Sequence, residues 1–359
     1  MSRFPQLLSP VTLGALTLRN RVIMAPMTRN RASADGLVPT FAATYFTQRA
    51  SAGLMITDAT MISPQAVGFA FVPAIFTEAH TAAWQTVVDA VRAVGGLLAL
   101  QLNHVGRLAL PAFQPDGAMP VAPWAIQAEN VVVRGPTLIE QPAPEPRALE
   151  LQEIPAIVAQ FGDAARRAKV AGFDAVEIHG ANGFLVDQFL RDGVNQRHDR
   201  YGGSVENRAR FLLEITEAVA KEIGADRTGV QLSPLSAAND MRDSDPLLTF
   251  SSVLKHLAAL DIAWTHLSAV NDSDFTRRLR DAHGKPFLLN GGFTADRAND
   301  AIKSDLAVAV SFGTPFIANP DLVERFALDA ALTEPDRSTF HTGGARGYTD
   351  YPRLGERDS

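Results

Sequence analysis

The 359-residue chain is 46% hydrophobic and 20% charged, a composition typical of a globular protein, and its formal charge is −6. This weakly acidic balance offers no broad attraction for nucleic acid or anionic lipid, so we expect a small-molecule partner. Because the sequence contains no cysteine, disulfides, thiolate nucleophiles and cysteine-ligated metals are excluded. We find no signal-peptide pattern and no run of about 18 apolar residues, and therefore expect a cytoplasmic protein without a membrane partner.

Residues 7–20 are the first predicted element. Apolar and polar residues alternate weakly on both sides of Gly14, which suits a tight turn. The segment precedes the first strongly apolar run of the chain. We therefore predict an N-terminal hairpin that forms a lid over the bottom of the fold.

Short apolar runs alternate with amphipathic segments through most of the chain, which is typical of βα units. In one such segment Trp84, Val87 and Val91 share a helical face, and Gly95 follows where the helix should end. Parallel strands joined by right-handed crossovers favour a closed (β/α)8 TIM barrel over an open sheet, with residues 1–359 forming one domain. The eight apolar runs span residues 22–25, 54–57, 97–102, 175–178, 229–232, 263–267, 287–289 and 307–312.

Residues 104–152 interrupt this repeat after the third predicted strand. The segment has no helical period and contains eight prolines between Pro111 and Pro146. Long irregular segments inside a barrel are usually either functional caps or loosely ordered excursions. Because this one follows a strand on the catalytic side of a barrel, we predict a capping subdomain over the site.

An imidazole and a carboxamide follow the fourth predicted strand, in the run HGANG at residues 179–183. Side chains at the C-terminal ends of barrel strands line active sites, and a neutral His179 beside Asn182 could hold one substrate oxygen with two donors. The alternative is that both residues only fix a strand-to-helix loop. The histidines show no metal-ligand spacing and no Gly-x-Ser-x-Gly elbow occurs, so we expect neither a metal nor a serine hydrolase.

Glycines follow the last two predicted strands, at Gly291, Gly292 and Gly313. Barrels commonly bind phosphate at this position, on the backbone N–H groups of such turns. An ordinary tight turn would also explain the glycine pair. Together with the polar strand ends, the pattern favours a cofactor that carries a phosphate.

Seven motifs occur in chain order between residues 5 and 354. They are APMTR at 25–29, QLNHVGR at 101–107, HGANG at 179–183, RYGGSVENR at 200–208, NGG at 290–292, FIANPDL at 316–322 and GYTDYP at 347–352. Together they resemble the old yellow enzyme family, the FMN-dependent ene-reductases built on a (β/α)8 barrel. The resemblance therefore implies this barrel and an FMN site for nearly the whole chain.

The resemblance also implies roles for single residues at the flavin. Thr28 would hydrogen-bond the flavin C4 carbonyl, while Pro26, Ala59 and Gln101 would form walls and contacts of the isoalloxazine ring. Gly292 and Gly313 would donate hydrogen bonds from their backbone N–H groups to the FMN phosphate.

For the substrate, the resemblance implies that His179 and Asn182 hold a carbonyl oxygen and polarise the conjugated double bond. Tyr348 would border the substrate pocket, as would Phe69. Asn103 stands where classical members often have tryptophan and would make this side more open and polar. Phe69, like Phe76, stands where members often have tyrosine.

Three residues depart from the family pattern where chemistry is expected. Phe184 stands where the family usually has a tyrosine that protonates the substrate α-carbon, and a positioned acid of this kind typically contributes about 10²–10⁴ in rate. Gln231 replaces an arginine that faces flavin N1 and C2. Thr314 replaces an arginine that grips the FMN phosphate. Losing both charge-assisted contacts is expected to weaken FMN binding by roughly 1–4 kcal/mol.

The sequence therefore predicts an FMN-binding, old-yellow-enzyme-like oxidoreductase that acts on an α,β-unsaturated carbonyl or related activated alkene, with NAD(P)H as reductant. One alternative, motivated by Phe184, Gln231 and Thr314, is a non-reductive isomerase or cyclase with FMN weakly held or absent. A second is a barrel that binds a small molecule without chemistry. Either a monomer or a homodimer is compatible with the sequence.

Overall fold

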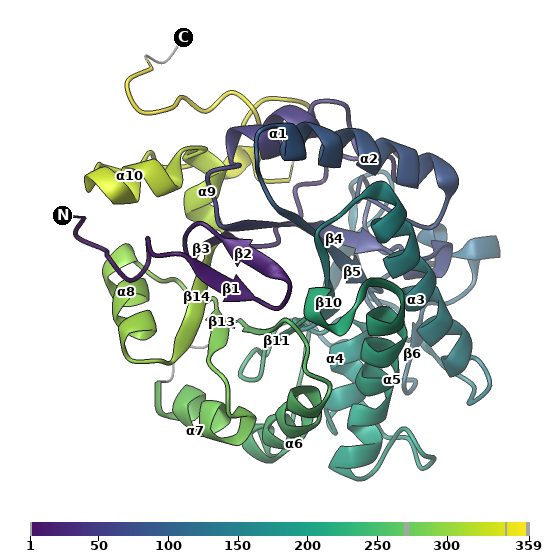
Figure 1. Cartoon of the computed structure of the whole chain (residues 1–359). Coiled ribbons are helices and arrows are strands. Elements are labelled where there is room, and N and C mark those ends of the chain that lie inside the picture. Colours follow the sequence, from purple (N-terminus) through teal and green to yellow (C-terminus); the bar gives the residue numbers. More distant parts are fainter. Residues whose placement is uncertain (1, 269–272, 342, 357–359) are drawn as a thin grey trace.

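Eight parallel strands close into a barrel in the computed structural model, which describes residues 2–268, 273–341 and 343–356 (Figure 1). Each strand pairs with the next one in chain order, and the last pairs with the first. The predicted (β/α)8 TIM barrel is therefore confirmed. Its strands are β3 (Val22–Met24), β4 (Leu54–Met61), β5 (Leu98–Asn103), β10 (Ala175–Gly180), β11 (Thr228–Leu232), β12 (Trp264–Leu267), β13 (Phe287–Leu289) and β14 (Ala307–Phe312).

Amphipathic helices surround the barrel and bury one face against it. In α2 the side chains of Trp84, Val87 and Val91 are buried, as their spacing predicts, and the helix begins with a capping box between Thr77 and His80. The helices are α1 (Ala42–Gln48), α2 (Glu78–Ala93), α3 (Ile154–Ala171), α4 (Leu185–Leu190), α5 (Val205–Ile223), α6 (Pro246–Ala259), α7 (Ser273–His283), α8 (Ala295–Lys303), α9 (Thr314–Ala318) and α10 (Leu322–Leu328). Among the described residues, no helix is long and apolar enough to cross a membrane.

The predicted N-terminal hairpin closes the end of the barrel where the strands begin (Figure 1). Its strands β1 (Val11–Leu13) and β2 (Leu16–Leu18) pair antiparallel, and Gly14 adopts the left-handed backbone (φ 53°) that the turn requires. The leucines of the hairpin form one buried cluster with barrel side chains such as Ile23 and Leu54. The opposite end of the barrel is thereby left for the functional site.

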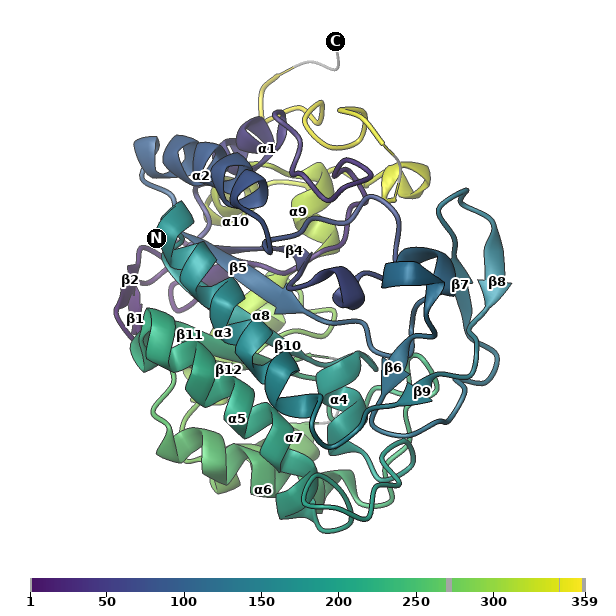
Figure 2. The ribbon, with the colours of Figure 1, turned by 90° about the vertical axis from the view of Figure 1, so that its right-hand side faces the viewer.

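The segment 104–152 projects from the barrel beyond β5 (Figure 2). Its antiparallel hairpin consists of β7 (Val132–Arg134) and β8 (Glu140–Pro142). A short parallel pair, β6 (Val121–Ala122) with β9 (Arg147–Ala148), joins its two ends, and the 3₁₀ turns Pro111–Phe113 and Pro115–Gly117 precede this pair. The prolines thus fall in turns and short strands, which explains the missing helical period.

A buried arginine ties this segment to the rest of the protein. The guanidinium of Arg107, fully buried, donates to the carbonyl of Ile126 within the segment and to those of Asn239 and Asp240 after β11. Such bonds satisfy a charge that would be costly to bury alone. The segment is therefore held against the C-terminal end of the barrel.

Candidate functional site

Four neighbouring strands bring predicted site residues together at their C-terminal ends. Gln101 of β5 pairs with Ala59 of β4 on one side and with Glu177 of β10 on the other. His179 of β10 pairs with Gln231 of β11. A register shift in β4, between Ile56 and Ala59, lets this strand continue past its predicted end to Met61.

The amide groups of Gln101 and Gln231 are oriented by a buried carboxylate. Gln101 Nε2 donates to Gln231 Oε1 at 2.8 Å and to Glu177 Oε1 at 2.9 Å, which uses both of its protons. The carbonyl of Gln101 and the NH2 group of Gln231 therefore remain for a ligand. An acceptor beside a donor is complementary to the pyrimidine edge of a flavin, where an N–H lies next to carbonyl groups.

Glu177 is fully buried, and its carboxylate has three hydrogen-bond contacts in this network. Its second oxygen accepts from Trp264 Nε1 at 2.8 Å and lies 3.0 Å from His266 Nδ1. Burial raises the pKa of Glu177, but pairing with His266 and the hydrogen bonds from Trp264 and Gln101 outweigh it, so the pKa lies below the ordinary value. The carboxylate is thus ionised and holds Gln101 in one orientation.

His179 lies at the same end as a neutral imidazole. Burial lowers its pKa to about 4, although nearby Glu177 acts in the opposite direction. Its Nδ1 atom is buried and has no hydrogen-bond partner among the described residues, which is unusual in a folded protein. The Oδ1 atom of Asn103, at the end of β5, is buried without a partner as well. These orphaned polar atoms indicate a site that a ligand completes.

Asn182 is presented to the site by a strained turn. Its backbone is left-handed (φ 56°), its N–H donates to Ser233 Oγ at 2.8 Å and its carbonyl accepts from Asn239 Nδ2 at 2.8 Å. Within the described residues no hydrogen bond engages its side-chain amide. The backbone contacts fix the turn while the carboxamide stays available to a substrate.

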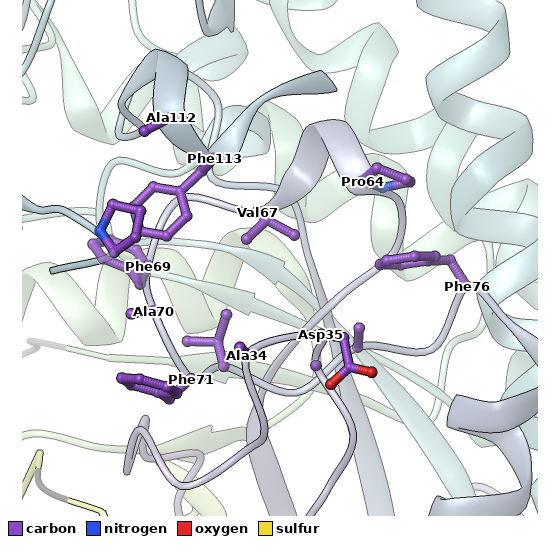
Figure 3. A pocket seen from close by; sticks show the side chains of 14 residues that line it. Ala34, Asp35, Pro64, Val67, Phe69, Ala70, Phe71, Phe76, Ala112 and Phe113 are labelled. Atoms are coloured by element: carbon purple, nitrogen blue, oxygen red, sulfur yellow. The ribbon is translucent and has the colours of Figure 1, made fainter. Parts of the chain in front are cut away.

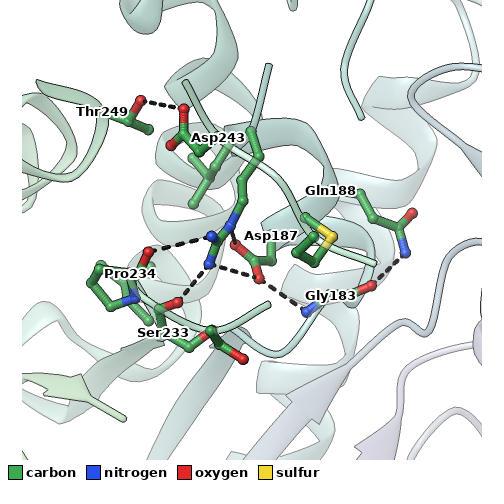
Figure 4. Close-up of polar contacts among 12 residues, drawn as sticks. Gly183, Asp187, Gln188, Ser233, Pro234, Asp243 and Thr249 are labelled. Atoms are coloured by element: carbon green, nitrogen blue, oxygen red, sulfur yellow. Dashed lines mark hydrogen bonds and ion pairs between the residues drawn. The ribbon is translucent and has the colours of Figure 1, made fainter. Parts of the chain in front are cut away.

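A buried ion pair anchors the loop that carries Asn182 (Figure 4). Asp187 accepts from the Gly183 N–H at 2.9 Å and from Arg191 Nε at 2.8 Å. The guanidinium of Arg191 also donates to the carbonyls of Ser233 and Pro234 after β11. Burial raises the pKa of Asp187, and Arg191 opposes that shift. These contacts therefore fix the loops after β10 and β11 relative to each other.

A cavity of about 320 Å³ opens beside this loop, and we call it the catalytic cavity. The ring of Phe184 lies in its wall, in edge-to-face contact with His179 (4.8 Å between centroids) and Phe69 (6.1 Å). Of the predicted substrate and flavin residues, Thr28, Phe69 and Phe184 line this cavity. Its lining comprises Thr28, Asn30, Phe69, Ala70, Val132, Arg134, Leu138, Glu140, Phe184 and His341.

His341 is one of the lining residues that the sequence did not single out. Its Nδ1 lies 3.2 Å from Asn30 Oδ1, and burial together with nearby Arg29 lowers its pKa. Arg134 and Glu140, both from the β7–β8 hairpin, form an ion pair (3.1 Å) and also line the cavity. Nothing in the sequence marked His341, because the residue lies more than 150 positions from the HGANG run and belongs to no motif.

Tyr348 takes a different position from the one expected at the substrate pocket. Its ring is 3% exposed, stacks on Tyr45 with 3.8 Å between centroids, and lies 4.9 Å from the guanidinium of Arg31. It does not line the catalytic cavity. The guanidinium of Arg29 donates to the carbonyls of Phe340 and Gly347 and so holds this C-terminal segment with Tyr348 turned inward.

The predicted phosphate-binding glycines leave open space around their backbones. Gly292 is exposed and left-handed (φ 63°), and a Cβ added there would meet no heavy atom within 4 Å. At Gly313 the nearest atom to such a Cβ is Met27 Sδ at 3.5 Å. Thr314 is exposed at the start of α9, and Arg297 NH1 donates to the Gly292 carbonyl at 3.3 Å. Backbone donors and one cation are thus available to an anion.

The residues present fit FMN rather than a metal. Gln101 and Gln231 offer a carbonyl and an NH2 group suited to the pyrimidine edge of a flavin, and the backbone at Gly292 is open toward a phosphate. In the described part of the chain, no group of three or more His, Asp or Glu side chains could hold a metal ion.

Comparisons with known proteins agree with this geometry. The family model for the NADH:flavin oxidoreductase / NADH oxidase family matches residues 6–332. The chain is 42% identical to 12-oxophytodienoate reductase 7 of Oryza sativa subsp. japonica and 41% identical to 12-oxophytodienoate reductase 2 of Arabidopsis thaliana. These matches cover 98% and 97% of this chain, and 96% of each relative.

Solved structures extend the similarity to the whole fold. Morphinone reductase in complex with tetrahydroNAD matches with a TM-score of 0.94 and 46% identity, over 98% of this chain and 99% of that one. The old yellow enzyme homologue from Zymomonas mobilis matches with a TM-score of 0.93 and 42% identity, over 97% and 99%. The chain is therefore an oxidoreductase that belongs to the old yellow enzyme family, whose enzymes use FMN and NAD(P)H.

Proposed function

We propose that the chain binds FMN at the C-terminal end of its barrel and acts on an α,β-unsaturated carbonyl or related activated alkene. The observation that carries this proposal is the neutral, buried imidazole of His179, which contacts Phe184 in the wall of the catalytic cavity and whose Nδ1 has no hydrogen-bond partner among the described residues. The carboxamide of Asn182, three residues further along, is also free of hydrogen bonds to the described residues. When bound, FMN supplies hydride to the β-carbon of the alkene. NAD(P)H is the external reductant that fits the family.

In this proposal Pro26 and Ala59 would form walls of the flavin site, and Thr28 would hydrogen-bond the C4 carbonyl. Gln101 would accept from the N–H of the pyrimidine edge, and Gln231 would donate to its carbonyl side. Ionised Glu177 supports this assignment, because it accepts a hydrogen bond from the Gln101 NH2 group and so fixes which end of that amide faces the ring. The backbone N–H groups of the two glycine turns, at Gly292 and Gly313, donate to the phosphate.

His179 and Asn182 activate the substrate by donating hydrogen bonds to its carbonyl oxygen. Negative charge grows on that oxygen as hydride adds to the β-carbon, so both bonds are stronger in the transition state than in the ground state. A neutral imidazole donates such a bond without losing its proton. The apolar rings of Phe184 and Phe69 contact each other beside this region, and Phe184 also contacts His179.

Protonation of the α-carbon is the step for which the site is poorly equipped. Phe184 has no hydroxyl, and all four tyrosines lie outside the catalytic-cavity lining. Water must then reach the α-carbon, and we expect the loss of a positioned acid to slow reduction by about 10²–10⁴. The same observation favours a second candidate function, a non-reductive isomerisation or cyclisation of the bound carbonyl compound.

We also infer that FMN is held more weakly than in a site with two arginines. Gln231 and exposed Thr314 offer only neutral contacts, and the difference amounts to roughly 1–4 kcal/mol. Arg297 offsets part of this loss, because its guanidinium lies beside the Gly292 turn. The negative carboxylate of Glu177, which contacts His266, does not replace the positive charge of an arginine near the ring.

Residues 104–152 act as the cap of the site in this proposal. The β7–β8 hairpin contributes Val132, Arg134 and Glu140 to the cavity wall, opposite Thr28 and Phe184. Because these side chains come from outside the barrel, they determine which substrates fit without altering the flavin contacts.

The test is an anaerobic cycle followed through the visible flavin band of FMN-loaded protein. NAD(P)H should bleach the band, and 2-cyclohexenone should restore it with formation of cyclohexanone. Bleaching without restoration, together with rearrangement of the enone, would favour the isomerase. A protein that cannot be loaded with FMN at millimolar concentration would contradict the proposal.

A further inference from the structure

A second cavity of about 340 Å³ adjoins the catalytic cavity, and we call it the annex (Figure 3). Phe69 and Ala70 belong to the lining of both cavities. The annex extends from this shared wall, with Phe69 and Phe113 on one side and Phe76 and Asp35 on the other, as Figure 3 shows. Its volume lies within the ~300–1,000 Å³ typical of ligand pockets.

Most of the side chains that line the annex are apolar. Four phenylalanines, at positions 69, 71, 76 and 113, surround it together with Val67 and several alanines and prolines. Asp35 is the one ionisable side chain among its fourteen lining residues. A hydrogen bond from Ser33 lowers the pKa of Asp35, and the backbone and His80 contribute, so the carboxylate is ionised at neutral pH. The annex therefore combines a largely apolar lining with one solvent-exposed negative group, Asp35.

The wall between the two cavities contains a strained residue. Phe71 has a left-handed backbone (φ 59°), which is rare for a bulky side chain. Two hydrogen bonds hold this conformation: Ala32 N–H donates to the Phe71 carbonyl at 3.1 Å, and Asn30 Nδ2 donates to the Ala70 carbonyl at 2.7 Å. Asn30 itself lines the catalytic cavity. Strain of this kind is retained where the surrounding structure requires it, as at binding sites.

Because the linings of the two cavities share Phe69 and Ala70, we propose that the annex is a substrate subsite for an apolar substituent, such as an alkyl chain or fused ring, on the activated alkene. The reacting carbonyl then lies at His179 and Asn182, and the substituent passes Phe69 into the annex. Ionised Asp35 makes the subsite selective, since it repels a substituent that ends in a carboxylate and tolerates a neutral one. This inference rests on the proposed function, whose substrate class it narrows.

The experiment measures binding without turnover, by calorimetry of saturated ketones with the FMN-loaded protein. The probes are cyclohexanone, 4-hexylcyclohexanone and 4-(5-carboxypentyl)cyclohexanone. Burying a methylene strengthens binding about fourfold, so the hexyl ketone should bind at least tenfold more tightly than cyclohexanone. The carboxypentyl ketone should lose most of that gain in affinity, and the Asp35→Asn variant should restore the gain.

Two variants fill the annex without touching the core. Ala34 and Ala112 are exposed lining residues, so Ala34→Phe and Ala112→Phe can fold and should each abolish the gain from the hexyl chain. Exposed Ala93, at the end of α2, gives the control Ala93→Phe, which should leave the gain unchanged.

The result separates this inference from the proposed function. Equal affinities of cyclohexanone and the hexyl ketone, or a gain that survives both filling variants, would overturn the annex. Chain-dependent binding supports the annex even if the anaerobic cycle reduces no enone, in which case only the proposed chemistry fails. If the enone is reduced but ketone affinity does not depend on the hexyl chain, the annex is not a substrate subsite and the proposed function still stands.

Discussion

The two ends of the barrel are built from the same eight strands but leave their side chains in different states. At the N-terminal end the hairpin residues Leu13, Leu16 and Leu18 are buried in an apolar cluster. At the C-terminal end His179 Nδ1 and Asn103 Oδ1 are buried without hydrogen-bond partners among the described residues. The first end is packed like a stable apolar core. The second end keeps buried polar atoms without partners, which is the pattern expected of a functional site.

The largest expected effect comes from adding a hydroxyl at the catalytic end. Phe184→Tyr should raise the rate of enone reduction by about 10²–10⁴, because a phenol beside His179 can protonate the α-carbon. Single-turnover reoxidation of the reduced, FMN-loaded variant by 2-cyclohexenone measures this. Phe113→Tyr, in the annex, is the control and should leave the rate unchanged. An unaltered rate in Phe184→Tyr would mean that proton delivery is not limiting.

Breaking the ion pair behind the site should cost the most stability. Asp187→Ala leaves Arg191 buried without its partner, and we expect a loss of about 3–5 kcal/mol in the free energy of unfolding. Urea denaturation measures it. The exposed pair Asp163–Arg166 provides the control, since Arg166→Ala should change stability by at most about 0.5 kcal/mol. Similar small losses in both variants would show that the pair does not anchor the loop.

A truncation at the closed end should lower stability but leave the site intact. Leu18 is fully buried in the hairpin cluster, so Leu18→Ala should cost about 2–5 kcal/mol. The FMN dissociation constant of the folded variant should equal that of the wild type. A changed FMN affinity at unchanged stability would contradict the division between the two ends.

The buried imidazole makes stability depend on pH. The pKa of His179 is about 4 in the folded protein against 6.5 unfolded, so below pH 6.5 the unfolded state binds the extra proton first. Its neutral form therefore contributes stability above pH 6.5, and this contribution is lost as the pH falls toward 4. Between pH 8 and 4, wild type should lose about 3 kcal/mol more than His179→Asn. Parallel pH profiles of the two proteins would contradict a depressed pKa.

The smallest expected effect concerns the phosphate end. Arg297→Ala should weaken FMN binding about three- to tenfold, as expected for one exposed charge-assisted contact. Fluorescence titration measures it, and riboflavin, which has no phosphate, is the matched ligand whose affinity should not change. Equal losses for FMN and riboflavin would place the role of Arg297 elsewhere.

Strand periodicity predicted the barrel well, because burial on both sides of a parallel strand leaves a continuous apolar run. It missed the extension of β4 to Met61, because a register shift there interrupts the apolar pattern. At the site, the HGANG run marked His179 and Asn182 because function and turn geometry are encoded locally. His341 and the inward ring of Tyr348 could not be predicted, since both depend on how Arg29 and Arg31 hold a segment over 300 residues away.

One titration tests the central claim, that separate strand ends converge on a flavin and a substrate carbonyl. The visible difference spectrum of oxidised, FMN-loaded protein is recorded as 2-cyclohexenone is added, in wild type and in a His179→Ala/Asn182→Ala variant with equal FMN content. We predict a saturable perturbation of the flavin band whose dissociation constant rises at least tenfold in the variant. The same perturbation and dissociation constant in both proteins would contradict the account.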